Sequence, residues 1–175
     1  GKKIKKISPS ELNIKSPKEI GKSFKANSEL KAKYFFQKSK ISTISDDSGL
    51  CVDCLNGKPG IYSARWAKNY GKFKKAGKKI LELVKNKNKN KKKKNTKAKF
   101  ICSLTFCFNG RRTVTTIGVI KGKISKKLLG KKGFGYDPIF IPKGSTKTFG
   151  QISKRKKILM DHRFIAFKKL KYKIN

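Results

Sequence analysis

Two adjacent carboxylates stand out in a chain with few acidic residues, 9 against 48 lysines and arginines. Asp46 and Asp47 are followed directly by a hydroxyl and a glycine, Ser48 and Gly49. Carboxylate oxygens bind the hard cation Mg²⁺, and one of two neighbouring carboxylates can take a proton from a water molecule. The pair therefore indicates a magnesium–phosphate site, with an Asx turn at a strand end as the alternative.

Two further clusters have side chains suited to a nucleotide. Residues 133–138 combine glycines and aromatic rings with Asp137, so the backbone can approach a ligand, a ring can stack on a base, and a carboxylate can accept from a base N–H. Residues 161–163 join an aspartate, a histidine and an arginine, with Lys157 about one helical turn earlier, and can address a base edge or a phosphate. An ordinary glycine-rich turn and a charged helix face are the alternatives.

Helices and strands must position these clusters. Apolar residues at helical spacing predict helices over 28–38 and 73–84, and a closing helix over 153–171 that Ser153 caps. β-rich runs predict strands over 41–45 and 50–55, and a hairpin of 98–108 and 113–120 about Asn109-Gly110. The carboxylate pair is then expected at a strand end, 85–95 as an exposed loop or frayed helix end, and 133–142 as a loop running into a strand.

The formal charge of +39 is typical of proteins that bind nucleic acids, because basic proteins release counterions from phosphate backbones. The basic residues are overwhelmingly lysine, whereas recognition of base edges favours the planar fork of arginine. The lysine excess comes with abundant Asn, Ile and Phe, a composition that AT-rich codons produce. We therefore expect no specific nucleic-acid partner, and keep a basic nucleic-acid-binding protein as the alternative from another functional class.

The four cysteines have spacing that permits a zinc module. Cys51 and Cys54 form one pair, and Cys102 and Cys107 can supply a second. All four lie in apolar, strand-like runs, so buried free thiols are expected instead. The chain has no apolar stretch of membrane-spanning length and no signal-peptide pattern, which predicts one cytoplasmic domain over residues 1–175 and no membrane partner.

The three clusters together resemble one enzyme family. The segment SDDSGLCVDCLNGKPGIYSARWA is similar to the signature ADDSGL-x-VD-x-LGG-x-PGIYSARYA of the inosine/xanthosine triphosphate pyrophosphatases. GFGYDPIF followed by a proline matches the second block of that family, and Lys157 followed five residues later by His162-Arg163 matches the third. The resemblance runs from about Ser10 to the C-terminus.

The resemblance implies an elongated, two-lobed α/β fold, with a long, twisted mixed sheet, flanking helices and a nucleotide cleft between the lobes. It implies a homodimer that uses Mg²⁺ to cleave the purine triphosphates ITP, dITP and XTP between the α and β phosphates. Asp47 would accept the proton of the attacking water and touch the metal, Asp46 would be a Mg²⁺ ligand, and Lys31 would face the phosphates. The implied substrate contacts are Ser48, Phe134, Gly135, Tyr136, Asp137, Lys157, His162 and Arg163.

Departures from the family pattern concern the phosphate and metal sites. The opening strand and phosphate-gripping (S/T)-x-Asn-x-x-Lys loop are not found, so an N-terminal truncation is expected, with residues 1–4 as a remnant just after that loop. Ala26 stands where the resemblance places a metal-binding glutamate, and Glu29, three residues on, is a candidate substitute. A degenerate member that keeps the fold but not catalysis is the alternative from within the family.

Overall fold

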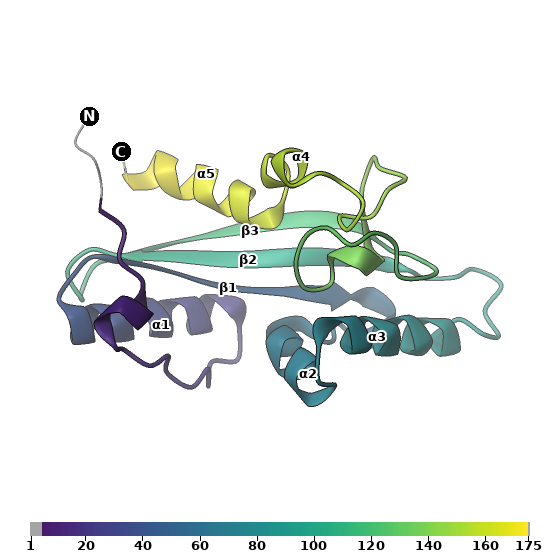
Figure 1. The fold of residues 1–175 in the computed structure, drawn as a ribbon, viewed down its shortest axis with the longest axis horizontal. Helices are drawn as coiled ribbons and strands as arrows, with labels where there is room; N and C mark the ends of the chain where they lie inside the picture. Colours follow the sequence, from purple (N-terminus) through teal and green to yellow (C-terminus); the bar gives the residue numbers. More distant parts are fainter. Residues whose placement is uncertain (1–4, 175) are drawn as a thin grey trace.

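A four-stranded sheet with helices on both faces forms the protein in the computed structural model, which describes residues 5–174 (Figure 1). The strands are β1 (Thr43–Val52), β2 (Lys97–Cys107), β3 (Thr113–Ile124) and β4 (Phe140–Pro142), in the order β1-β2-β3-β4. Every neighbouring pair is antiparallel, so the described part of the sheet is antiparallel and not mixed as the resemblance implied. The expected remnant at residues 1–4 lies outside the described residues.

The helices lie on opposite sides of this sheet. Figure 1 shows α1 (Phe24–Ser39), α2 (Ser63–Asn69) and α3 (Phe73–Lys87) below the strands, and α4 (Lys154–Ile158) and α5 (His162–Ile174) above them. The Ser23 hydroxyl caps α1 by accepting from the Ala26 amide, and Ser153 caps α4 in the same way through Lys156. Helix α1 contacts the face of β1 that carries Asp47 and α5 the face that carries Asp46, so helices cover both faces of the sheet, which confirms the predicted α/β class.

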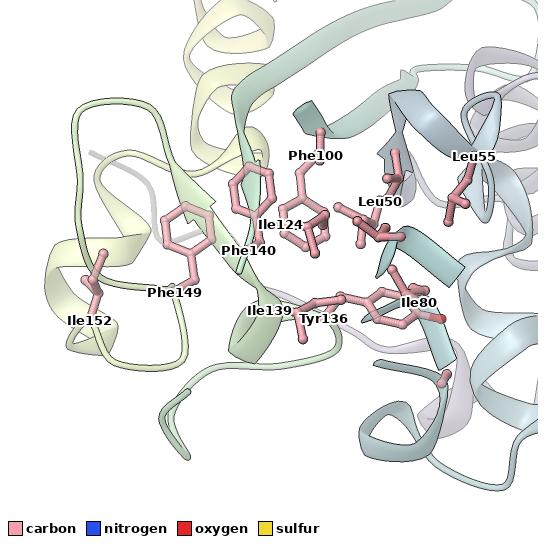
Figure 2. Close-up of a cluster of buried hydrophobic side chains, with 14 residues drawn as sticks. Leu50, Leu55, Ile80, Phe100, Ile124, Tyr136, Ile139, Phe140, Phe149 and Ile152 are labelled. Carbon is pink, nitrogen blue, oxygen red and sulfur yellow. The ribbon is translucent and has the colours of Figure 1, made fainter. Parts of the chain in front are cut away.

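A hydrophobic core fills the end of the sheet next to α3. Figure 2 shows Leu50 and Phe100, which are partners in the β1–β2 register, meeting Ile80 of α3 and the rings of Phe140 and Phe149. The centroids of Phe100 and Phe140 are 4.7 Å apart in an edge-to-face arrangement. The other end of the sheet is held between α1 and α5, so the molecule has two differently packed halves with β1 and β2 running through both.

Several predicted element boundaries need correction. Residues 43–52 form one continuous strand, so the aspartate pair lies within β1 and not at a strand end. The closing helix is divided into α4 and α5 by a turn at 159–161. In the lysine-rich segment, α3 extends to Lys87, and the buried Asn88 then fixes the loop by hydrogen bonds with Asn95. The hairpin about Asn109-Gly110 is confirmed.

The cysteines are all free, and Cys51, Cys102 and Cys107 are buried as expected, whereas Cys54 is partly exposed. No helix within residues 5–174 has the length and apolar character needed to cross a membrane.

Candidate functional site

A cleft of ≈ 300 Å³ brings together every site residue expected from the sequence. These residues are Lys31, Asp46, Asp47, Ser48, Phe134, Gly135, Tyr136, Asp137, Lys157, His162 and Arg163. A volume of this size is at the lower end of the range for small-molecule sites. A larger hollow of ≈ 720 Å³ lies over β2, β3 and β4 and contains none of them, so the smaller cleft is the candidate active site.

The alternation of side chains along β1 sends the two aspartates to opposite faces of the sheet. Asp47 points to α1, where the Asn27 side-chain amide donates to its Oδ2 at 3.0 Å. Asp46 points to α5, where Arg163 Nε donates to its Oδ2 at 3.1 Å, and the Ser48 hydroxyl donates to the same oxygen at 2.8 Å. Since β1 is an edge strand of the described sheet, a ligand that lies against this edge can reach both carboxylates.

Asp47 is a buried carboxylate with one free oxygen. It is only 6% exposed, and burial raises the pKa of Asp47 above its usual range. The hydrogen bond from Asn27 and the charge of Lys31, whose Nζ lies 3.9 Å from Oδ1, act in the opposite direction on this pKa. Its Oδ1 is not used by a hydrogen bond within the described residues, so it can accept a proton from a water in the cleft.

Glu19 is a cleft residue that the sequence analysis missed. Its Oε1 lies 2.6 Å from Lys31 Nζ, and the Glu19 charge contributes to the raised pKa of Asp47. The following Gly21 donates to the Asn27 side chain at 2.8 Å, which fixes this segment against the start of α1. The scarcity of acids was the signal that could have found Glu19.

Glu29 does not substitute for the expected metal-binding glutamate. It is two residues beyond Asn27, about 200° around the helix, so it leaves the cleft side of α1. Its Oε1 instead accepts from the Thr115 hydroxyl at 2.8 Å, and it does not line the cleft.

Asp137 fixes the glycine- and aromatic-rich loop from within. It is 1% exposed, and its Oδ2 accepts from the Phe134 amide at 2.6 Å and from Lys157 Nζ at 2.7 Å. Burial raises the pKa of Asp137, and these two donors oppose the rise. Gly133 has φ +81°, and a Cβ there would lie 2.1 Å from Asp137 Oδ2. Of the carboxylate that was expected to accept from a base N–H, Oδ2 is therefore used by the Phe134 amide and by Lys157.

The aromatic residues of the same loop have different surroundings. Phe134 is 68% exposed at the cleft and packs edge-to-face on Phe73, with ring centroids 4.9 Å apart. Tyr136 is buried, its hydroxyl donates to the Ser63 carbonyl at 2.9 Å, and burial raises the pKa of its phenol. Phe134 is therefore the ring that is free to stack on a base.

The first turn of α5 presents the remaining polar groups. Asp161 caps the helix by accepting from the Phe164 amide at 2.9 Å. His162 is 2% exposed and stacks on Phe100 with centroids 4.9 Å apart and an interplanar angle of 10°. Burial, with the positive charges of Arg163 and Lys157, lowers the pKa of His162 to about 3, so its ring is neutral at physiological pH.

The carboxylates fit a magnesium ion that a nucleotide brings with it. Mg²⁺ in proteins is commonly held by one or two carboxylates together with substrate phosphates and waters. Asp47 and Glu19 both flank Lys31, which gives two hard oxygen donors on one side of the cleft. No group of three His, Cys, Asp or Glu side chains within residues 5–174 is placed to hold a metal by itself.

Comparisons with known proteins identify the family of the chain. The model of the Ham1 family matches residues 1–173. A dITP/XTP pyrophosphatase of Dictyoglomus thermophilum is 41% identical over 170 residues, which are 96% of this chain and 80% of that protein. A dITP/XTP pyrophosphatase of Zymomonas mobilis is 37% identical, with 95% and 78% covered. The structure of a HAM1 protein from Coxiella burnetii superposes with a TM-score of 0.86 at 28% identity, over 94% of this chain and 83% of that one. This chain therefore belongs to the Ham1 family, whose relatives include the dITP/XTP pyrophosphatases.

Proposed function

We propose that the chain hydrolyses the non-standard purine nucleoside triphosphates dITP, ITP and XTP to the monophosphate and pyrophosphate. One observation carries the proposal: the three sequence clusters, which lie far apart along the chain, line the same cleft. Removal of such nucleotides keeps deaminated bases out of the precursor pool. The resemblance to the family extends the proposal to a homodimer that works in the cytoplasm.

Asp47 is the proton acceptor for the attacking water in this proposal. Its raised pKa brings the carboxylate closer to neutral pH, and a general base is most effective when its pKa is near the working pH. Asn27 occupies Oδ2 and leaves Oδ1 for the water. The Asn27 side-chain amide therefore orients the Asp47 carboxylate and also stabilises its negative charge.

Lys31 and Glu19 form the phosphate side of the cleft. Lys31 Nζ, paired with Glu19 at 2.6 Å, can turn to a phosphate oxygen, because its flexible stem allows the ammonium to change partners. Asp47 and Glu19 would hold the magnesium ion, which supplies neutralisation of charge on the phosphates. The requirement for Mg²⁺ is thus part of the proposal.

The base side of the cleft favours an oxo group. Hypoxanthine and xanthine carry a carbonyl where adenine carries an amine, and His162 and Arg163 supply N–H donors that a carbonyl can accept. A buried donor that faces an amine loses its partner, which costs about 1–3 kcal/mol. Phe134 supplies an exposed ring for stacking on the base.

Release of pyrophosphate from XTP, dITP and ATP, each with Mg²⁺ and with EDTA, tests this function. We expect cleavage of XTP and dITP that depends on the metal, and little cleavage of ATP. Nucleotide binding without turnover, independent of Mg²⁺, would contradict the proposal and leave a degenerate family member. Cleavage of ATP equal to that of XTP and dITP would contradict the assignment of the base side.

A further inference from the structure

A chain of hydrogen bonds runs from β1 to the first turn of α5, on the face of the sheet opposite Asp47. It begins at Ser48, whose hydroxyl donates to Asp46 Oδ2 at 2.8 Å, and the same oxygen accepts from Arg163 Nε at 3.1 Å. Arg163 NH1 then lies 3.4 Å from His162 Nε2. Asp46 is thus connected to both residues of the base side, and its partners are separate from those of Asp47.

The direction of these bonds fixes where the proton of His162 lies. A guanidinium has five N–H donors and no acceptor, so His162 Nε2 must accept in its contact with Arg163. The ring is neutral, because burial and two neighbouring positive charges lower the pKa of His162. A neutral imidazole that accepts at Nε2 carries its hydrogen on Nδ1.

The Nδ1–H of His162 is then a buried donor that has no acceptor within residues 5–174. Nδ1 is the buried side-chain nitrogen or oxygen atom within residues 5–174 for which no hydrogen-bond partner is present. Leaving such a donor unpaired is unfavourable, so a carbonyl oxygen that comes within hydrogen-bond distance of it is favoured. His162 lines the same cleft as Phe134 and Arg163, where the base of a nucleotide is proposed to lie.

The geometry points to Asp46 as a positioning residue for purine specificity, and not as a ligand of the magnesium ion. Asp46 holds Arg163 by Nε, which directs NH1 to His162 and so presents N–H donors from both residues to a 6-oxo group. The side chains of Asp46 and Arg163 are 39% and 49% exposed, so their ion pair contributes little to the stability of the protein. Its effect is to orient the Arg163 guanidinium. This inference rests on the proposed function for its substrate class.

Replacement of Asp46 by asparagine tests the inference in the full chain. Asn has nearly the same shape but lacks the charge that attracts Arg163 Nε. We expect the ratio of kcat/KM for ITP to that for ATP to fall on the order of tenfold in Asp46→Asn, because the donors are no longer fixed. The Mg²⁺ concentration for half-maximal activity should not change. Asp53→Asn is the matched control, since Asp53 is an exposed carboxylate just after β1 that lines the other hollow, and it should leave both quantities unchanged.

Coupling between the two residues distinguishes positioning from a structural role. In an Arg163→Gln background, the further change Asp46→Asn should have no additional effect on the ITP/ATP ratio, because Asp46 acts through Arg163. Additive effects would overturn the inference. A raised Mg²⁺ requirement with an unchanged ratio would also overturn it and identify Asp46 as a metal ligand.

Binding of monophosphates without metal separates this inference from the proposed function. Calorimetric titration of IMP and AMP in EDTA should show that the wild-type protein prefers IMP, and that Asp46→Asn loses most of this preference. The measurement needs no turnover, so it holds even if the chain releases no pyrophosphate. Equal binding of IMP and AMP by the wild-type protein, or an IMP preference retained in Asp46→Asn, would refute the positioning role.

Discussion

At Gly118 in β3 the backbone of α5 packs directly against the strand. Substitution of Gly118 by alanine should therefore displace α5 and lower activity, although Gly118 does not line the cleft. A Cβ at this position would lie 2.0 Å from the His162 carbonyl oxygen and 2.5 Å from the Ala166 amide nitrogen. Both are backbone atoms of α5, so no side-chain rotation relieves the contact. Since real Cβ atoms essentially never come closer than 3.0 Å, the first turn of α5 must retreat by roughly 1 Å.

The expected cost follows from that displacement. Overpacking of this kind destabilises a protein by about 1–3 kcal/mol. The retreat also moves the turn that begins with His162, and a misplacement of about 1 Å in an active site can lower activity on the order of 100-fold. Urea unfolding gives the first quantity for Gly118→Ala, and kcat/KM for XTP gives the second.

Gly77→Ala is the matched control for this prediction. Gly77 lies within α3, and a Cβ there meets Leu128 at 3.5 Å and Ile139 at 3.8 Å, which are ordinary contacts. This substitution should stabilise the protein by about 0.4–1 kcal/mol and leave activity unchanged. If Gly118→Ala has the stability and activity of the wild-type protein, close approach at β3 does not position α5, and the reasoning is refuted.

Two further predictions concern buried charges. Asn27→Leu removes the donor that opposes the raised pKa of Asp47, so this pKa should rise further and the acid limb of the pH profile of kcat/KM should move to higher pH; an unmoved limb would exclude Asp47 as the titrating base. Lys157→Met leaves the Asp137 carboxylate buried without its cation, which should cost about 3–5 kcal/mol in urea unfolding at neutral pH. Part of that loss should be recovered as the pH falls and Asp137 takes up a proton, whereas the exposed neighbour Lys156→Met should change little at any pH.

Local sequence signals predicted much of the fold. Asn109-Gly110 between two β-rich runs identified the β2–β3 hairpin, and apolar residues at helical spacing identified α3. The single strand at 43–52 was missed, because its polar centre is stabilised by tertiary contacts to α1 and α5 that no local pattern records. The division of the closing helix depends on the turn that ends with the Asp161 cap, which the apolar spacing does not show.

The sequence predicted which residues line the candidate site, but not which of them form hydrogen bonds with one another. The motifs identified residues that do share one cleft, yet adjacency in sequence suggested that Asp46 and Asp47 act together. A strand sends neighbouring side chains to opposite faces, and only the assembled fold shows that one meets Asn27 and the other Arg163. Glu19 was missed because a single acid in an irregular segment has no periodicity, and its role depends on the position of Lys31.

The most direct test of the account is Mg²⁺-dependent release of pyrophosphate from XTP by Asp47→Asn, measured beside the wild-type protein. Asparagine keeps the shape of the side chain but cannot take a proton, so we predict a loss of turnover on the order of 100- to 10,000-fold. Thermal unfolding at neutral pH should show equal or greater stability, because the raised pKa of Asp47 means that burial disfavours its charged form. Turnover equal to that of the wild-type protein would contradict the assignment of Asp47 as the base, and with it the mechanism.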